Sequence, residues 1–317
     1  MPEVVTFGET MILMNPVRPG PIKYVTDFKK QIGGAESNVS IGLARLGHSV
    51  GWFSRLGDDP HGQYIKSFVQ GEDVDVSEVI YDPDAPTGLY FKERREVGEN
   101  RVYYNRQGSA ASRLSPDDLP QDYIANAEIL HVTGITPALS PSCRKAVFRA
   151  VEIANENDVL VSFDPNLRLK LWKDREELRA VMEELFEMAD LVLPGIEEGR
   201  VVLGTDDPQT IGERLVERGA EAVAVKLGAE GALVSTPGGS DRIAGIEVEA
   251  VVDEIGAGDG FAAGFLAGHL RGQDPYQAAR LGNAVGAFCT TVIGDVEGLP
   301  TNEELDVFLG EEEAVAR

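Results

Sequence analysis

Short apolar runs that recur along the chain constrain its fold more than any other feature. They are rich in Val, Ile and Leu and lie at 4–7, 49–57, 128–135, 159–166, 189–195 and 222–228. Amphipathic helices are predicted between most of them, for example at 34–47, 140–157, 173–189 and 207–219. Near-continuous apolar strands that alternate with helices are typical of a largely parallel sheet covered on both faces. The sequence therefore predicts an α/β fold, with mostly helical structure from Asp259 to about residue 293.

Two strand-rich segments, 9–32 and 86–107, interrupt this alternation. The second has two β-prone arms around Val-Gly-Glu-Asn, which is typical of a hairpin. We expect the two segments to form a small antiparallel sheet that projects from the α/β body. Because the sequence has no internal repeat and no long linker, residues 1–317 are predicted to form one domain.

The chain is strongly acidic, with 53 Asp and Glu against 29 Lys and Arg and a formal net charge of −24. Such a charge repels phosphodiester backbones, so we expect no nucleic-acid partner. The acidic residues are spread along the whole chain. This predicts a halophile-like acidic surface, since salt of about 1 M shortens the Debye length to about 3 Å and screens self-repulsion. The alternative is an acidic protein of a mesophile that is not adapted to high salt.

The first residues, MPEVVTFGETM, lack a basic region, and no apolar stretch approaches the roughly 20 residues of a membrane span. Neither a signal peptide nor a membrane partner is therefore predicted. Cys143 and Cys289 are too few for a disulfide framework and lack metal-ligand spacing, so both are interpreted as reduced thiols. We expect a cytoplasmic protein.

Three polar segments follow predicted strands: FDPNLR (163–168), VKLGAEGA (225–232) and DEIGAGDGF (253–261). In open α/β sheets, ligands bind where strands end and helices begin. The third segment follows the apolar run IEVEAVV (246–252) and precedes a predicted helix, so it is expected at such a strand end. The three segments together predict one binding site.

The glycine-rich segment DEIGAGDGF predicts an anion site, because the N–H groups of Ala257, Gly258 and Asp259 would lie at a helix N-terminus. It is not a dinucleotide fingerprint, since its third glycine is misplaced, and the chain has no Gly-Lys-Ser/Thr of a phosphate-binding P-loop. A helix start capped by Asp259 is the purely structural alternative. A carboxylate beside a transferring phosphoryl group can instead accept the proton of an attacking hydroxyl, while backbone amides stabilise the developing charge.

DEIGAGDGF resembles the second signature of the ribokinase-like (PfkB) carbohydrate kinases, Asp-Thr-x-Gly-Ala-Gly-Asp-x-Phe, and GGAESNVSIGLARLG (33–47) resembles their first. The resemblance implies a three-layer ribokinase-like sandwich, with a mostly parallel central sheet and a small antiparallel lid built from about 9–32 and 86–107. It further implies that Asp259 is the catalytic base and that Gly256, Ala257 and Gly258 form the anion hole. ATP with Mg²⁺ would be the phosphoryl donor.

The chain departs from the family pattern at two positions. Glu254 replaces the usual threonine, near a monovalent-cation site in some members, so a potassium requirement stays open. The family's Asn-x-x-Glu motif is Gly-Ile-Glu-Glu (195–198) here. Glu198 would orient water around Mg²⁺, or else be an exposed glutamate at a helix start.

VKLGAEGA is a tight turn between two strands in the simplest interpretation, with Gly228 and Gly231 at positive φ. The resemblance implies that this turn contacts ATP and that Lys226 lies near the phosphates. The predicted ATP contacts are Asn166, Arg168, Lys226, Gly228, Gly231, Gly256 and Gly258.

The lid hairpin and the strand end near residue 166 carry groups suited to an anionic sugar. Tyr104 and Arg106 point to the same side of one arm, Tyr90 lies on the other arm, and Arg168 follows the strand at 159–166. Guanidinium groups match a carboxylate, and burying two of them against a neutral sugar would be costly. In the alternative, these arginines pair with nearby acidic residues.

YYNRQGSAASRLSP (103–116) and DPNLRLKLW (164–172) are similar to one branch of the family, the 2-keto-3-deoxygluconate kinases. This similarity implies a sugar-acid pocket, and the predicted substrate contacts are Gly34, Asn38, Tyr90, Tyr104, Arg106, Arg168 and Asp295. We expect ATP-dependent phosphorylation of the terminal hydroxyl of 2-keto-3-deoxygluconate in Entner–Doudoroff type sugar catabolism. The alternatives are a kinase of the galactose-derived epimer, fructose or ribose, and a non-catalytic sugar-binding regulator. Exposed edges of the lid sheet predict a homodimer through the lid.

Overall fold

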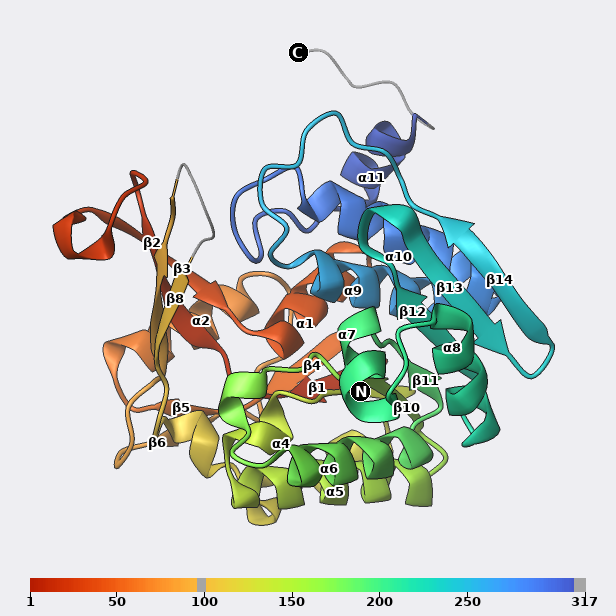
Figure 1. Cartoon of the computed structure of the whole chain (residues 1–317). Helices are drawn as coiled ribbons and strands as arrows, with labels where there is room; N and C mark the ends of the chain where they lie inside the picture. The colour runs from red at the N-terminus through yellow and green to blue at the C-terminus, as the bar shows by residue number, and fades with distance from the viewer. Residues whose placement is uncertain (96–100, 311–317) are drawn as a thin grey trace.

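An eight-stranded sheet forms the centre of the molecule in the computed structural model, which describes residues 1–95 and 101–310 (Figure 1). Its strand order is β14-β13-β12-β11-β10-β9-β1-β4. Neighbouring strands are parallel from β12 to β4, whereas β13 and β14 are antiparallel additions at one edge. The strands are β1 (Val4–Phe7), β4 (Val50–Phe53), β9 (Ile129–Thr133), β10 (Leu160–Asp164), β11 (Leu191–Val192), β12 (Ala222–Lys226), β13 (Gly231–Thr236) and β14 (Gly239–Ala244).

Helices cover both faces of this sheet, as the apolar pattern predicts. One face carries α1 (Ala35–Arg45), α2 (Pro60–Gln70), α9 (Ala257–Leu270), α10 (Pro275–Cys289) and α11 (Asn302–Leu309). The other carries α3 (Gln121–Ala125), α5 (Pro141–Glu156), α6 (Arg175–Met188) and α8 (Pro208–Glu217). The short helices α4 (Thr136–Leu139) and α7 (Ile196–Glu198) follow β9 and β11. Among the described helices, none is both long enough and apolar enough to cross a membrane.

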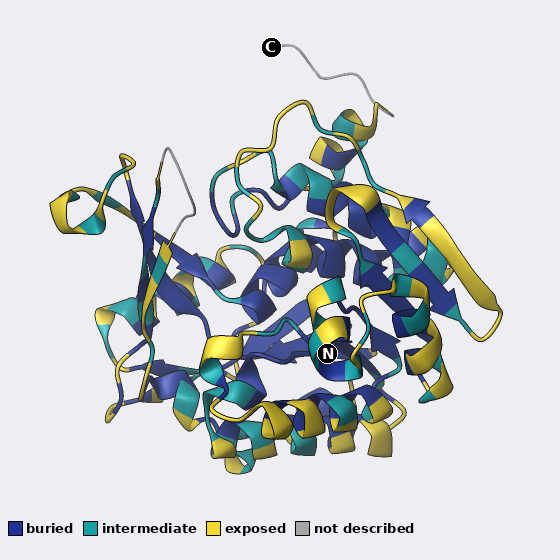
Figure 2. Cartoon of the chain, in the orientation of Figure 1, coloured by how far each residue is buried: buried dark blue, intermediate teal, exposed yellow. Residues whose placement is uncertain are grey.

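Successive residues of the strands enter two separate cores. Val4 packs with one core and Val5 with the other, and Ile129 and Leu130 divide in the same way. This follows from the alternation of side chains along a strand, and it explains why strands buried on both faces are apolar throughout. Figure 2 shows the parallel strands buried, with exposed residues on the outer surfaces of the helices, along the edge strand β14 and on the lid. The predicted three-layer arrangement is confirmed.

A second sheet of four strands stands beside the body, at the left of Figure 1. Its order is β3 (Phe28–Gly33), β2 (Met11–Pro16), β7 (Leu89–Glu93) and β8 (Arg101–Asn105). The two outer pairs are antiparallel, as expected, but the central pair of β2 and β7 is parallel. The chain crosses the body between these two strands, and such a crossover allows parallel pairing. The predicted hairpin joins β7 and β8, and its turn lies at 96–100, outside the described residues.

The apolar run at 246–252 forms no strand, contrary to the expectation. The main sheet ends at β14, and the chain then returns to α9 as an irregular segment in which Val251 is 56% exposed. Ile246, Val248 and Val251 line a cavity, and Ile246 also packs against the edge of a core. Its apolar residues thus line a cavity wall beside the core, a role that periodicity cannot distinguish from that of a strand.

The helices α9 and α10 pack closely, and this contact fixes the start of α9 at the end of the sheet. A Cβ atom at Gly264 would lie 2.8 Å from the carbonyl oxygen of Leu281 and 2.9 Å from the Cα atom of Gly282. Only glycine allows the two backbones to approach this closely. The remaining strands, β5 (Arg55–Gly57) and β6 (Ile80–Asp82), form a small parallel pair.

Candidate functional site

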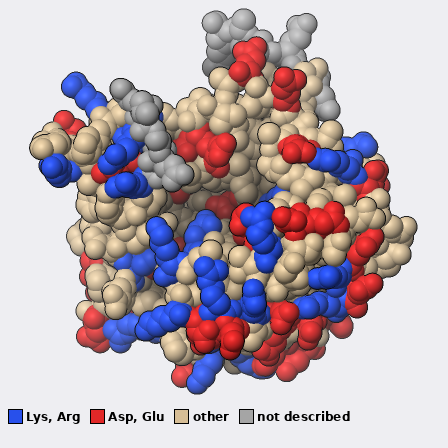
Figure 3. All heavy atoms as spheres, viewed as in Figure 1, with Lys and Arg blue, Asp and Glu red and all other residues tan. Residues whose placement is uncertain are grey.

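Two adjoining cavities lie at the carboxyl ends of the central strands. The larger, of about 470 Å³, extends from the lid strands β7 and β8 to the start of α9. The smaller, of about 350 Å³, lies between the 228–231 turn, the 246–251 segment and helices α9 and α10. Both are lined by Lys226, Glu254 and Gly258. Figure 3 shows this face hollowed between the lid and the body, with acidic and basic residues at the rim.

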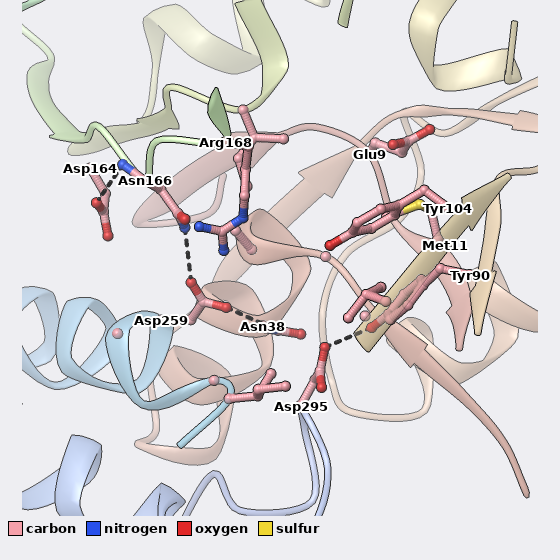
Figure 4. A pocket seen from close by; sticks show the side chains of 18 of the residues that line it. Glu9, Met11, Asn38, Tyr90, Tyr104, Asp164, Asn166, Arg168, Asp259 and Asp295 are labelled. Atoms are coloured by element: carbon pink, nitrogen blue, oxygen red, sulfur yellow. Dashed lines mark hydrogen bonds between the residues drawn. The ribbon is translucent and has the colours of Figure 1, made fainter. Parts of the chain in front are cut away.

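Asp259 lies on the floor of the larger cavity, at the third position of α9. Its Oδ2 atom accepts a hydrogen bond of 2.7 Å from the Asn38 amide, and Oδ1 accepts one of 3.4 Å from Asn166 (Figure 4). The N-cap residue is Gly256, so the alternative in which Asp259 merely caps the helix is wrong. Two amide donors from different elements therefore hold the carboxylate toward the cavity.

The environment of Asp259 prepares it to accept a proton near neutral pH. Burial raises the pKa of its carboxyl to about 7, the nearby Asp164 carboxylate also raises it, and the Asn38 hydrogen bond with the charges of Arg168 and Lys226 lowers it. A general base works best when its pKa is close to the operating pH. Asp259 meets this requirement in the free protein.

The turn before Asp259 has the geometry of an anion site. Gly256 has φ of +84°, and a Cβ atom there would lie 2.7 Å from the carbonyl oxygen of Asp295, so the position requires glycine. The N–H groups of Ala257, Gly258 and Asp259 belong to the first turn of α9, where N–H groups lack partners within the helix. They lie at the positive end of the helix dipole, which favours an anion.

Lys226 brings positive charge to the same turn. A Cβ atom at Gly258 would lie 4.0 Å from its Nζ atom, and Lys226 forms a 2.6 Å ion pair with the buried Asp164. Gly228 and Gly231, which follow Lys226, have φ of +62° and +96° and line the smaller cavity. The predicted positive φ of both glycines is therefore confirmed.

Asn166 and Arg168, predicted as ATP contacts, line the larger cavity together with Asp259. Asn166 has φ of +36°, a strained conformation for a residue with a side chain, and its amide faces Asp259. Arg168 is exposed, and Figure 4 shows its guanidinium group near Asp259 and Asn38. Across residues 1–95 and 101–310, Arg168 forms no ion pair with an acidic side chain.

The far side of the larger cavity is formed by the lid. Tyr90 lies opposite Tyr104 in the β7–β8 register, with 5.5 Å between the ring centroids. The Arg106 guanidinium group lies 5.4 Å from the Tyr104 centroid and forms a 2.5 Å ion pair with the buried Glu9. Of the two arginines predicted to bind the sugar acid, Arg106 is thus paired with an acidic residue, as the alternative in the sequence analysis expects.

Asp295 lies between the lid and the body, in the loop after α10. One of its carboxylate oxygens accepts a 2.8 Å hydrogen bond from the Tyr90 hydroxyl, and the other lies 3.3 Å from Lys92 Nζ. Burial raises the pKa of the Asp295 carboxyl, and the charge of Lys92 acts against this shift. Gly34 lines the same cavity, and a Cβ atom there would lie 2.5 Å from the carbonyl oxygen of Glu9.

Three charged residues of the cavity were not predicted to have a role in the site: Glu9, Lys92 and Asp164. Glu9 and Asp164 lie at or just beyond the carboxyl ends of β1 and β10, where ligand sites are expected, so their positions carried a usable signal. Lys92 lies two residues from Tyr90, and the period of a strand puts both side chains on the same face. The sequence gives no sign that a lysine is buried there.

Glu198 lies at the edge of the larger cavity, with both carboxylate oxygens bound to backbone. It accepts hydrogen bonds from the N–H groups of Leu167 (3.1 Å) and Gly195 (3.0 Å). In the described part of the chain, no three His, Cys, Asp or Glu side chains form a ready metal cluster. Magnesium bound to a nucleotide needs only one or two carboxylates, with phosphates and water as its other ligands. Glu198 caps the start of α7 with its carboxylate, as the helix-start alternative expects, and its role toward Mg²⁺ stays a prediction.

The fold and the site together define a class of enzyme, the sugar kinases of ribokinase-like fold. Residues 1–302 match the pfkB family of carbohydrate kinases, and the chain belongs to this family.

Relatives and solved structures extend this match. The chain is 41% identical to the 2-dehydro-3-deoxygluconokinase of Bacillus subtilis (strain 168), over 99% of this chain and 97% of that protein. It is 39% identical to the 2-dehydro-3-deoxygluconokinase of Thermoproteus tenax, over 98% of this chain and 94% of that protein. The structure of a putative ribokinase II from E. coli with ATP and Mg²⁺ superposes with a TM-score of 0.91 at 26% identity, covering 98% of this chain and 100% of that one.

Replacing the Asp259 carboxylate should separate catalysis from nucleotide binding. Asp259→Asn keeps the size of the side chain but removes the proton acceptor, so we expect kcat to fall by roughly 10²–10⁴-fold. ATP affinity, measured by calorimetry, should persist, because the smaller cavity is untouched. Asp122→Asn, at the exposed first turn of α3, is the matched control. Normal turnover by Asp259→Asn would refute its role as the base.

The pH profile should reveal the Asp259 carboxylate directly. Because the base must be ionised, we expect log kcat/KM to fall with a slope of one below a pKa of about 7. Asn38→Ala removes a hydrogen bond that lowers this pKa, so the acidic limb should move to higher pH. Asn155→Ala, at an exposed amide, should leave the limb in place. A limb that stays fixed in Asn38→Ala would contradict the assignment.

Proposed function

We propose that the chain transfers the γ-phosphoryl group of ATP to the terminal hydroxyl of 2-keto-3-deoxygluconate, also called 2-dehydro-3-deoxygluconate. One observation carries this proposal: the Asp259 carboxylate faces a cavity whose other side presents arginine and tyrosine side chains. Near full-length similarity to two 2-dehydro-3-deoxygluconokinases supports the choice of sugar. The reaction would serve Entner–Doudoroff type sugar catabolism.

The acceptor hydroxyl is activated by Asp259. As its oxygen forms a bond to the γ-phosphorus, the proton passes to the carboxylate, and the bond from that phosphorus to the β–γ bridging oxygen breaks to release ADP. Asn38 and Asn166 hold the carboxylate in place. The N–H groups of the Gly256–Gly258 turn and Lys226 stabilise the negative charge on the phosphoryl group.

ATP occupies the smaller cavity in this proposal. Its base lies against the apolar walls formed by Ile246, Val251 and Phe261, and its phosphates extend past the 228–231 turn toward Gly258. Both cavities meet at that glycine, so donor and acceptor come together there. Asp164 and Glu198 would hold Mg²⁺ through water, and the ion would neutralise charge on the phosphates.

The carboxylate of the sugar acid binds between Arg106 and Arg168. The Nε atom of Arg106 is buried without a hydrogen-bond partner among the described residues, although the guanidinium group is paired with Glu9. A buried guanidinium donor without an acceptor is costly, and a ligand carboxylate would satisfy it. Tyr90, Tyr104 and Asp295 line the same side of the cavity. They would contact the sugar there, with Gly34 and Asn38 at its hydroxyls.

A sugar-binding regulator is the second class of function that such a fold could serve. A regulator needs no proton acceptor, whereas Asp259 has a pKa of about 7, which suits a general base that works near neutral pH. The catalytic proposal is therefore preferred. Cys143 and Cys289 are both free and buried, which supports a reducing, cytoplasmic location.

Turnover of paired acceptors by wild type and Arg106→Ala tests the sugar-acid proposal. The acceptors are 2-keto-3-deoxygluconate, its galactonate epimer, fructose, ribose and a neutral analogue of the acid in which an alcohol replaces the carboxylate. ADP release is followed by a coupled assay. Loss of a charged hydrogen bond should raise KM for the acid by roughly tenfold to a hundredfold. KM for the neutral analogue and for ATP should not change.

The outcomes of this assay separate the candidate functions. Turnover limited to neutral sugars would refute the sugar-acid proposal, and no turnover on any acceptor would favour the regulator. Preference for the galactonate epimer would change the sugar but leave the mechanism. An equal rise in KM for the acid and its neutral analogue would show that Arg106 does not bind the carboxylate.

We also propose that two copies of the chain associate through their lid sheets. The edge strands of this sheet are β3 and β8, and β8 is exposed along most of its length. Tyr103 on β8 is 43% exposed, and Tyr24, close to β3, is 73% exposed. Unprotected edge strands with large apolar side chains favour pairing with a second copy.

Light scattering of the purified protein tests this association. A dimer would have twice the 34.2 kDa mass of the chain. Tyr103→Lys should shift the protein toward the monomer, because it adds charge to the proposed interface. Tyr81→Lys, at a tyrosine 37% exposed on β6 and outside the lid, should not. A wild-type monomer at assay concentration would refute the proposal.

A further inference from the structure

Lys92 is buried in a place that no packing argument explains. It lies on the lid strand β7, is 2% exposed, and is among the largest fully buried side chains described. A buried ammonium group is costly unless charged partners surround it. The partners of Lys92 therefore indicate what the charge is for.

Two carboxylates from different loops meet at Lys92. Its Nζ atom lies 3.2 Å from Asp253 Oδ2, in the loop before α9, and 3.3 Å from Asp295 Oδ1, in the loop after α10. The second oxygen of Asp295 accepts the hydrogen bond from Tyr90, which lies on the same face of β7 as Lys92. One ammonium group thus joins the lid to both loops.

Both loops support the anion-hole turn. Asp253 accepts a 3.3 Å hydrogen bond from the N–H of Ile255, immediately before Gly256. On the other side, the carbonyl oxygen of Asp295 lies 2.7 Å from the position of a Cβ atom at Gly256. Without a cation between them, the Asp253 and Asp295 carboxylates would repel each other and move the backbone on which the turn rests.

We propose that Lys92 is a positioning residue that supplies a fixed positive charge behind the anion-hole turn. It connects the acceptor side of the cavity, through Asp295 and Tyr90, to the turn that holds the phosphoryl group. The proposal rests on the functions proposed above for Asp259 and that turn. Because the ammonium group is covalently attached to the lid, the site needs no free monovalent cation at this point.

The first test removes the positive charge of Lys92 and then the negative charge of its partner Asp253. Lys92→Met leaves two buried carboxylates without a cation, and we expect kcat to fall about 10²-fold, the effect of an ångström-scale misplacement. The ATP dissociation constant without sugar should change far less than kcat, since Lys92 lies outside the smaller cavity and is connected to it through the turn at Ala257 and Gly258. Adding Asp253→Asn to Lys92→Met should restore part of kcat. Lys145→Met, at an exposed lysine on α5 and outside the lid, is the control.

A second measurement needs no variant and so does not depend on folding. Wild-type turnover should be equal in potassium chloride and in choline chloride at the same ionic strength. A requirement for potassium would overturn the proposal, as would normal kcat in Lys92→Met or a double variant no better than the single one. Failure of the proposed function can be told apart from failure of the Lys92 proposal. In that case wild type would not phosphorylate the acid, or Asp259→Asn would retain turnover.

Discussion

If Asp259 is to act as a base, its negative carboxylate must stay close to the negative phosphates of ATP, which repel it. The rest of the site depends on how this repulsion is overcome. Asp259 is the third residue of the same helix whose first N–H groups are proposed to attract the phosphoryl group. Burial keeps its pKa near 7, so the carboxylate is ready to accept a proton at neutral pH. Asn38 and Asn166 direct it toward the acceptor cavity. In the proposed mechanism, the helix would therefore bind negative charge with its backbone and remove a proton with its third side chain.

Charge pairing inside the cavities compensates for the acidity of the whole chain. With a net charge of −24, the protein does not attract ATP or a sugar acid through its overall field. Basic residues are instead held against carboxylates: Lys226 against Asp164, Arg106 against Glu9, and Lys92 against both Asp253 and Asp295. Each pair fixes the position of a cation without making the site strongly positive. Arg168 has no such pair in the described residues, so its charge is not neutralised by a neighbouring carboxylate.

The periodicity of the sequence predicted the central strands and most of their helices, because residues buried on both faces leave an unmistakable apolar run. The local glycine pattern likewise predicted the turn at Gly256 and the position of Asp259. Lys92 could not be predicted, since its burial depends on two loops distant in sequence that meet only after folding. The run at 246–252 was misinterpreted as a strand for a related reason: apolar residues lining a ligand cavity have the same composition as residues lining a core.

The same burial that prepares Asp259 for catalysis acts against the stability of the fold. Its pKa is raised from 3.8 to about 7 in the folded state, so the folded protein holds this proton more tightly than the unfolded chain does. The carboxyl therefore destabilises the fold progressively as the pH rises from about 4 to 7, and the full cost remains above that range. Asp75 and Asp82, whose pKa values are lowered by hydrogen bonds and, at Asp82, by Arg55, act in the opposite sense and stabilise the fold at neutral pH. Asp75 and Asp82 lie outside both cavities. The pKa values of Asp295, in the larger cavity, and of the buried Glu36 are raised like that of Asp259. At Asp259 this is the sign expected where function, rather than stability, determines the residue.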